Sequence, residues 1–410
     1  MQKTKQKQDI PRGWQRVKLG DISRLRKGLT YKSSHYSNEQ DGLIFLTLKS
    51  IQRGGGFNTE GVKYYAGDFD KNAVVKEDDL VIANTDITRN AEVVGAPMLL
   101  PKLVKEPALI SMDLSVVDIE DGKADNHYLY YLLQTPAARN FMRDHSSGST
   151  VLHLKTKDVP NFDLTIPPLQ EQKKIAEILG AVDKEIQKTD EIISATEKLK
   201  RGLMQKLLVQ GNGISTTLEN IGEFKRGPFG GALKKEIFVA DGYKVYEQKN
   251  AIYNDFSLGS YFIDSEKFEQ MKGFELRSGD ILISCSGTLG KVAVVPQHSK
   301  KGIINQALLK ITPSKEWDVL YVKYLLEAEY IQNRFVKVAP GSAMKNMASM
   351  LTIKSTKVTK PKFKEQQKIA NILSSVDEKI SINQKLKDKL TLLKKGLMQD
   401  LLSGSKRVNV

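Results

Sequence analysis

Apolar residues recur at spacings of three and four over two long stretches of the chain. In the first stretch they are Ile175, Ile178, Leu179, Val182, Ile186, Ile193, Leu199, Leu203 and Leu207. In the second they are Ile369, Ile372, Leu373, Val376, Ile380, Leu386, Leu390, Leu393, Leu397 and Leu401. Spacings of this kind, sustained over about five heptads, are typical of a coiled-coil seam. The pattern predicts two long helices, over residues 166–210 and 361–404.

The two stretches are copies of one another. Residues 172–208 and 366–402 align without a gap, and close to half of the aligned positions are identical. Such self-similarity is the signature of an internal repeat. The two stripes pack most economically on each other, and an antiparallel pair would give the chain a pseudo-two-fold axis. Gly202 and Gly396 are equivalent interior positions where glycine costs ~1 kcal/mol relative to alanine, so we expect close backbone packing there.

The regions that precede each helix have a different pattern. They contain short β-branched runs bounded by Gly, Asp, Asn or Pro, which is typical of strands: residues 81–85, 113–119, 280–284, 291–295 and 307–312. Helical segments, such as residues 127–133 and 321–335, lie between the runs. We therefore predict an α+β protein with two mixed α/β domains, residues 12–165 and 215–360, joined by the two long helices as an antiparallel coiled coil. Gly211-Asn212-Gly213 is the expected joint between the halves.

Composition narrows the class of partner. The formal net charge is +15, while the hydrophobic and charged fractions of 40% and 27% are ordinary for a globular protein. A basic excess of this size favours a polyanion such as double-stranded DNA, although it can also serve solubility alone. The single cysteine and the five histidines show no metal-ligand spacing, which argues against a metal site. Without a membrane-length apolar run or a signal-peptide core, we expect a cytoplasmic protein with no membrane partner.

The internal comparison suggests a division of labour. The helices have stayed similar, which indicates that they do the same job, whereas the domains have diverged, which indicates the same kind of job on different targets. A two-part DNA site with unlike halves fits this description. A helix of about 37 residues spans roughly 55 Å, and major grooves recur on one DNA face every ~34–36 Å. We therefore expect two specified half-sites separated by an unspecified gap.

Several segments resemble a known family. Pro11-Arg12-Gly13-Trp14, followed by residues 17–22, resembles the start of a type I restriction–modification specificity subunit. Residues 279–284 with 287–292, residues 304–307, and above all the helix openings 167–172 and 365–370 are similar to the same family. The resemblance covers nearly the whole chain, and the order of the segments, which occurs twice, is its most specific feature. The first domain departs from the pattern at residues 84–90, where its loop is rebuilt.

The resemblance implies a complex in which this chain is not the catalyst. Such subunits carry two target-recognition domains, bind two adenine methyltransferase subunits, and can recruit two restriction subunits. S-adenosylmethionine, ATP and Mg are then expected only in the partner subunits, and this chain is expected to bind no cofactor.

Motifs for chemistry in the chain itself are weak. Pro167-Pro168 lacks the asparagine of an adenine methyltransferase motif, and residues 287–291 lack the spacing and the Ser/Thr of a phosphate loop. A loop that contacts DNA phosphates, or a plain hairpin, are the alternatives for residues 287–291. Asp377-Glu378-Lys379 matches a nuclease pattern only superficially, because it lies in the seam region of a long helix. Two alternatives stay open: a self-sufficient DNA methyltransferase, and a coiled-coil tether with protein-binding modules.

Candidate DNA contacts are loops rich in Lys, Arg, Ser, Thr, Asn and Asp, because these side chains contact phosphates and base edges. In the first domain they are Lys49, Ser50, Arg53, Asn84, Thr85, Asp86, Thr88, Arg89, Asn90, Ser147, Ser149, Thr150 and His153. In the second they are Lys225, Arg226, Lys249, Asn250, Ser284, Ser286, Thr288, Lys291, Ser342, Lys345 and Asn346.

Overall fold

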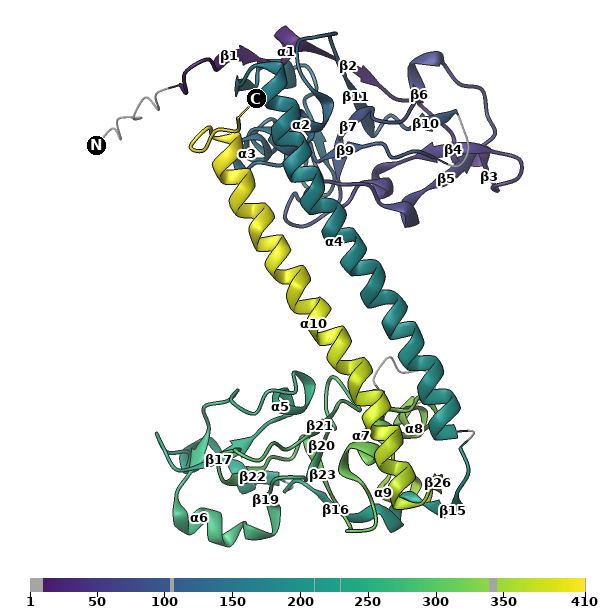
Figure 1. The fold of residues 1–410 in the computed structure, drawn as a ribbon, viewed down its shortest axis with the longest axis vertical. Helices are drawn as coiled ribbons and strands as arrows, with labels where there is room; N and C mark the ends of the chain where they lie inside the picture. The colour runs from purple at the N-terminus through teal and green to yellow at the C-terminus, as the bar shows by residue number, and fades with distance from the viewer. Residues whose placement is uncertain (1–9, 104–106, 210, 229, 339–344, 410) are drawn as a thin grey trace. The chain divides into compact units, whose positions relative to one another are not determined.

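The computed structural model describes residues 10–103, 107–209, 211–228, 230–338 and 345–409. The chain divides into two compact units, residues 1–188 with 387–410 and residues 189–386. Each unit contains one of the two domains together with one part of each long helix (Figure 1).

The first unit is built on two main sheets. One has the antiparallel order β2 (Ser23–Lys27), β11 (Leu114–Ile119), β7 (Leu80–Ala83), β9 (Pro97–Leu99). The other has the order β3 (Tyr36–Ser37), β5 (Lys63–Tyr65), β4 (Leu43–Leu46), β10 (Ala108–Ile110), β6 (Val74–Val75), in which β4 and β10 are parallel. Two smaller sheets pair β1 (Gln15–Lys18) with β14 (Asp163–Ile166), and β12 (Ser146–Ser147) with β13 (Leu152–Leu154) and β8 (Thr85–Asp86).

Three short helices accompany these sheets: α1 (Leu19–Ile22), α2 (Asn126–Leu133) and α3 (Pro136–Asp144). The Asp125 carboxylate accepts from the Tyr128 amide at 2.9 Å and so caps α2. Thr135 caps α3, and Pro136 occupies its first turn, where no amide donor is needed. The core buries Tyr128, Leu133 and Met142 together with Leu179 of α4 and Leu401 of α10, so both long helices belong to this core.

The second unit repeats the plan. Its antiparallel sheet has the order β16 (Gly222–Arg226), β23 (Leu308–Pro313), β20 (Ile281–Ser284), β21 (Val292–Val294). Its other main sheet has the order β18 (Phe262–Ile263), β17 (Tyr243–Tyr246), β22 (Gly302–Ile304), β19 (Glu275–Leu276), with β17 and β22 parallel. The smaller pairs are β15 (Ile214–Thr217) with β26 (Lys357–Lys360), and β24 (Val336–Val338) with β25 (Lys345–Met347). The predicted internal repeat therefore extends to the diverged domains.

The second unit's helices are α5 (Gln248–Ile252), α6 (Ser265–Gln270), α7 (Val319–Glu327), α8 (Glu329–Phe335) and α9 (Met350–Lys354). Residues 321–335, predicted as one helical segment, form two helices because Ala328 has the extended backbone angles φ −62° and ψ 138°. The core packs Tyr321 and Leu325 of α7 and Ile331 of α8 against Leu208 and Leu373.

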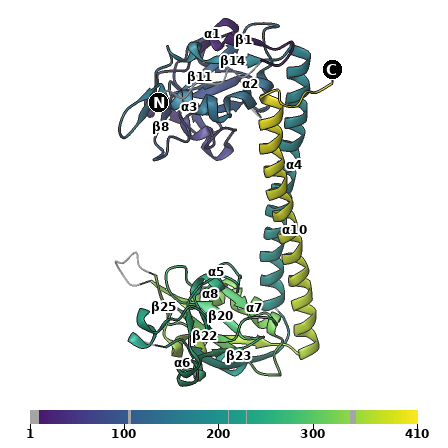
Figure 2. The ribbon, with the colours of Figure 1, turned by 90° about the vertical axis from the view of Figure 1, so that its left-hand side faces the viewer.

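The two long helices confirm the strongest sequence prediction. They are α4 (Leu169–Met204), continued by a π-helical turn at Gln205–Val209, and α10 (Phe363–Leu402). In the first unit Lys394 of α10 contacts Asp183 of α4, and in the second Lys200 of α4 contacts Asp377 of α10. In both units, therefore, the later part of one helix lies beside the earlier part of the other, as an antiparallel pair requires (Figure 2). Whether the pair interlocks as a coiled coil stays a prediction.

Two details of the helix prediction are wrong. A Cβ atom built at Gly202 or Gly396 has no atom within 4 Å among the described residues, and both glycines are exposed, so neither marks close backbone packing within this chain. Four of the predicted seam residues are also exposed: Leu199 by 55%, Ile372 by 44%, Leu386 by 45% and Leu393 by 49%. Two threonines, Thr189 and Thr196, are buried instead.

Candidate nucleic-acid interface

The three candidate segments of the first unit meet on one surface. Strand β13 pairs with β8, which places Leu152 opposite Asp86 and His153 opposite Thr85. The Gly54 amide donates to the Glu92 carbonyl at 2.8 Å, and the Arg53 guanidinium lies 3.3 Å from the Glu92 carboxylate. Residues 49–56, 84–93 and 146–153 are therefore adjacent, although the sequence separates them widely.

Buried polar side chains hold the loop at residues 84–93 in shape. Asp86 is only 1% exposed, and its carboxylate accepts from the amides of Thr88, Val93 and Val94 at 2.5, 2.5 and 2.8 Å. Burial by itself would raise the pKa of Asp86, but the hydrogen bonds from Thr88, Val94 and Val93 outweigh it, so the pKa lies below its ordinary value. Asp86 therefore organises the loop and does not present its carboxylate to a base edge.

Asn84 and Thr85 are also buried. The Asn84 amide donates to the Met112 carbonyl at 3.0 Å, and the Thr85 hydroxyl donates to Asp113 at 3.2 Å. As candidate DNA contacts, Asn84, Thr85 and Asp86 are corrected, because their side chains are used inside the fold.

The other candidates of this surface face outward. Arg89, Asn90, Ser147, Ser149, Thr150, His153 and Lys49 are exposed, and the Arg53 side chain is 71% exposed. Thr88 is half-buried, and its hydroxyl accepts from the Glu92 amide at 2.9 Å. Ile87, which is not among the predicted contacts, is 66% exposed beside them. An exposed apolar side chain in a polar loop is the signal that could have identified it, because such groups contact the methyl group of thymine.

Ser50 and Asn250 are buried for the same reason. Each is the third residue of a short helix, and its side chain accepts a hydrogen bond from the backbone amide of the N-cap residue. The Ser50 hydroxyl accepts from the Thr47 amide and donates to Gly61. The Asn250 side chain accepts from the Glu247 amide and donates to the carbonyls of Asp255 and Leu258. Both are corrected from DNA contacts to residues that shape a loop.

The loop at residues 284–291 is the second unit's counterpart. Ser284 is buried, donates to the Thr288 carbonyl at 2.5 Å and accepts from the Lys291 amide at 3.0 Å, so it too is corrected to a loop anchor. Gly287 and Gly290 adopt φ of +58° and +77°, a left-handed conformation that glycine accepts without strain. Ser286, Thr288 and Lys291 are exposed around this turn. They stay candidates for contacts to DNA phosphates.

The remaining candidates of the second unit are less exposed. On β16, Lys225 lies 5.1 Å from the centre of the Phe274 ring, and Arg226 donates to the Met347 sulfur at 2.8 Å. Lys249 lies 2.7 Å from Glu247. Ser342 lies outside the described residues, as do the side chains of Lys345 and Asn346 on β25.

Comparison with known families identifies the family of the chain. The model of the type I restriction modification DNA specificity domain matches residues 11–197 and again residues 215–392. The chain belongs to this family. The two matches coincide with the two copies of the repeat, and the family resemblance predicted from the sequence is confirmed.

Relatives of this specificity family align over almost the whole chain. The MjaVIII type I restriction enzyme specificity subunit of Methanocaldococcus jannaschii is 24% identical over 97% of this chain and 94% of its own length. The EcoBI type I restriction enzyme specificity subunit of Escherichia coli is 22% identical over 87% and 77%. Among solved structures, the S subunit of M. genitalium has a TM-score of 0.61 at 17% identity, covering 99% of this chain and 98% of that one. This likeness confirms the fold.

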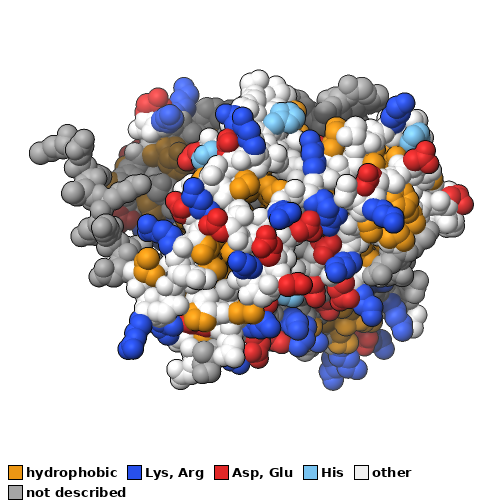
Figure 3. Space-filling view, turned by 90° about the horizontal axis from the view of Figure 1, so that it is seen from above, with side chains coloured by type: hydrophobic (Ala, Val, Ile, Leu, Met, Phe, Trp, Pro, Cys, Tyr) orange, Lys and Arg blue, Asp and Glu red, His pale blue; other side chains and the backbone are white. Residues whose placement is uncertain are grey.

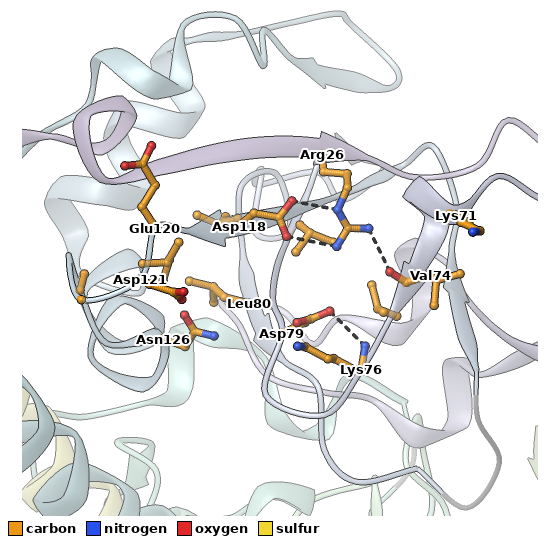
Figure 4. Close-up of a pocket in the computed structure, with 16 residues that line it drawn as sticks. Arg26, Lys71, Val74, Lys76, Asp79, Leu80, Asp118, Glu120, Asp121 and Asn126 are labelled. Atoms are coloured by element: carbon orange, nitrogen blue, oxygen red, sulfur yellow. Dashed lines mark hydrogen bonds and ion pairs between the residues drawn. The ribbon is translucent and has the colours of Figure 1, made fainter.

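One cavity of the first unit is lined by both basic and acidic side chains. A cavity of about 670 Å³ is lined by Arg26, Lys71 and Lys76 and by four acidic residues, Asp79, Asp118, Glu120 and Asp121 (Figure 4). Arg26 bonds the Asp118 carboxylate at 2.8 and 3.1 Å and the Val74 carbonyl at 2.9 Å. The lining contains none of the predicted DNA contacts, and its acidic excess does not suit a phosphate group.

Basic and acidic side chains are mixed on one face of the first unit. On the face of the first unit that Figure 3 shows, Lys and Arg side chains are interspersed with Asp and Glu.

The described residues give no support to other chemistry. They contain no group of three or more His, Cys, Asp or Glu placed to hold a metal ion. Burial raises the pKa of the Cys285 thiol to about 11, which disfavours a reactive thiolate. In the same part of the chain, no helix is long and apolar enough to cross a membrane.

Proposed function

We propose that the two domains of this specificity-family chain read the two unlike halves of one DNA site, while the chain scaffolds partner subunits that carry out the chemistry. The observation that carries the proposal is the meeting of residues 49–56, 84–93 and 146–153 on one surface, with Arg53, Arg89 and Asn90 directed outward. Arginine, asparagine, lysine and hydroxyl side chains are the groups that contact DNA phosphates and base edges.

The division of labour accounts for the different loops. In the first unit Asp86 holds the loop that carries exposed candidate residues, and in the second unit Ser284 holds the corresponding loop. Loops with different anchors present different side chains from the same strand framework. Two different half-sites are what such a pair of domains would read.

The long helices offer matched apolar positions for partner subunits. Ile192 and Leu199 of α4 are 43% and 55% exposed, and the equivalent residues of α10, Leu386 and Leu393, are 45% and 49% exposed. Matched exposed apolar residues on both copies of a repeat suit two copies of one partner. We assign them to two methyltransferase subunits, which would supply S-adenosylmethionine chemistry, and two restriction subunits using ATP and Mg would complete the complex. Acting on DNA places this complex in the cytoplasm.

Mapping methylated adenines tests the proposal. DNA from cells that carry this chain with its partner subunits should gain adenine methylation at a two-part site with an unspecified gap. Cells that lack only this chain should lose that methylation. Methyl transfer by the purified chain alone would establish instead a self-sufficient methyltransferase. An assembled complex whose DNA affinity is insensitive to salt would favour a protein-binding tether, because phosphate contacts release counterions.

The spacer role of the helices has its own test. Removing residues 184–190 and the equivalent residues 378–384 takes out about two turns, ~10 Å of each helix, and keeps the seam period. The gap in the methylated site should shorten by about three base pairs. An unchanged gap would refute the spacer role.

The docking role is tested separately. Ile192→Glu with Leu199→Glu should weaken methyltransferase binding and leave the unfolding temperature of the free chain within a few degrees. The matched control is Ser194→Glu with Lys198→Glu, which places the charges on exposed polar positions of the same helix. Unchanged assembly of the apolar-site variant would remove these residues from the interface.

A further inference from the structure

In each domain, one side chain of α3 or α8 donates a hydrogen bond to the loop that carries candidate DNA contacts. In the first unit, Arg139 of α3 donates from Nη2 to the Glu92 carbonyl at 3.1 Å. In the second, Gln332 of α8 donates from Nε2 to the Gly290 carbonyl at 2.9 Å and to the Leu326 carbonyl at 2.6 Å. Glu92 and Gly290 both belong to the segment that connects the paired strands of the antiparallel sheet, β7 with β9 and β20 with β21.

Each helix is pressed against its loop. Near the end of each loop stands a glycine in the left-handed conformation, Gly95 with φ +65° and Gly290 with φ +77°. A Cβ at Gly95 would lie 2.4 Å from Met142 of α3, and a Cβ at Gly290 would lie 2.1 Å from the side-chain oxygen of Gln332. The loop backbone at each glycine therefore lies close against a side chain of the helix.

In the first unit, Glu92 is the residue that joins the candidate segments 49–56 and 84–93. The Glu92 carbonyl accepts from Gly54 as well as from Arg139, its carboxylate pairs with Arg53, and its amide donates to Thr88. Arg139 therefore acts on the residue through which the segment at 49–56 meets the segment at 84–93.

Arg139 is only partly exposed. Its Nη1 atom is buried and has no hydrogen-bond partner among the described residues. Burial lowers the pKa of Arg139 to about 10, repulsion from Arg143 adds to this shift, and attraction by Asp86 opposes it. A guanidinium held in this way behind the loop is placed to shape the loop and not to bind a phosphate.

We propose that Arg139 and Gln332 are positioning residues for DNA recognition, each setting the loop of its own domain and thereby the selectivity for one half-site. The inference rests on the proposed function, because it requires that these loops read DNA. It adds that arginine in one copy and glutamine in the other is part of what makes the two halves of the site different.

The test compares half-sites within one complex. The full chain is assembled with its methyltransferase subunits on a duplex that carries the mapped two-part site, and on two duplexes with one base pair changed in either half. Arg139→Met keeps a long side chain and removes the donors. It should reduce discrimination against the change in one half-site about tenfold and alter the other within twofold. Gln332→Met should show the reverse selectivity, and Arg139→Lys, which keeps a donor, should restore part of the loss.

Two further measurements decide between positioning and other roles. The slope of affinity against salt should be unchanged in Arg139→Met, whereas a direct phosphate contact would lower it by about one and overturn the proposal. Equal loss at both half-sites together with a lower unfolding temperature would also overturn it, as a merely structural role. Arg143→Met, at an exposed neighbouring arginine, is the matched control and should retain both selectivities. A wild-type complex without half-site selectivity would overturn the proposed function instead.

Discussion

The Lys200 ammonium on α4 lies 2.7 Å from the Asp377 carboxylate on α10 in the second unit. At the equivalent positions in the first unit, Lys394 of α10 lies 2.7 Å from Asp183 of α4. A tyrosine of the adjoining domain donates to the same aspartate in each case, Tyr324 to Asp377 and Tyr131 to Asp183, both at 2.9 Å. One contact between a domain and both long helices is therefore used twice.

The second copy of this contact carries more charge. Glu327 lies 3.4 Å from Lys200, and Lys323 lies 3.2 Å from Asp377. Burial opposes the charge on Lys200, but attraction by Glu327 and the bonds to Asp377 outweigh it, so its pKa is raised. Burial likewise opposes the charge on Asp377, but the bond from Lys200 and the attraction of Lys323 lower its pKa.

Lys200→Met should lower the free energy of unfolding more than Lys394→Met. It leaves the Asp377 and Glu327 carboxylates with Lys323 as their remaining close cation, at a site that is largely but not fully buried. We expect a loss of about 1–3 kcal/mol, below the 3–5 kcal/mol typical of fully buried pairs. Denaturant unfolding measures the difference, and Lys198→Met, at an exposed position, is the control. Equal losses for Lys200→Met and Lys394→Met would contradict the role of the additional charges.

Asp86 should make stability depend on pH in the acid range. Its pKa in the folded chain lies below the ordinary value of 3.8, so its contribution is fully present above about pH 4. That contribution is lost as the pH falls through the depressed folded value. Asp86→Asn should therefore destabilise the chain at neutral pH and show a smaller fall in unfolding free energy on acidification. If both proteins have the same slope against pH, the loop does not depend on this carboxylate.

Gly202→Ala and Gly396→Ala should each stabilise the free chain. Open space surrounds a Cβ at both positions, and alanine is favoured over glycine in a helix interior by roughly 0.5–1 kcal/mol. Denaturant unfolding of each variant measures this gain. A loss of stability would show that the backbone at these positions is packed more closely than in the present structure.

Arg89→Ser should weaken DNA binding at every sequence and flatten its salt dependence. An exposed arginine that contacts one phosphate contributes about one unit to the slope of log affinity against log salt. Titration of the assembled complex at several salt concentrations gives this slope. The matched control is Arg24→Ser, because Arg24 is an exposed arginine outside the candidate loops. Relaxed selectivity at one base pair with an unchanged slope would assign Arg89 to base reading.

Local periodicity explains how much of the fold could be predicted. The spacing of Ile175, Leu179 and their equivalents Ile369 and Leu373 repeats every turn, so the long helices and their duplication are recorded in neighbouring residues. This spacing does not show which face of each helix is buried. Leu199 and Leu393 satisfy the apolar spacing and are exposed, whereas Thr196 is buried, because the position of the partner helix decides burial.

The sequence by itself determined the repeat, the two long helices, the family and the loops that present candidate DNA contacts. Only the tertiary structure separated the outward residues, such as Arg89 and Lys291, from buried loop anchors such as Asp86 and Ser284. The physical reason lies in the side chains themselves. Short polar residues that can bind bases and phosphates are also the residues that satisfy buried backbone groups in turns. Their chemistry is the same in both uses, and only burial shows which use the fold has made of each.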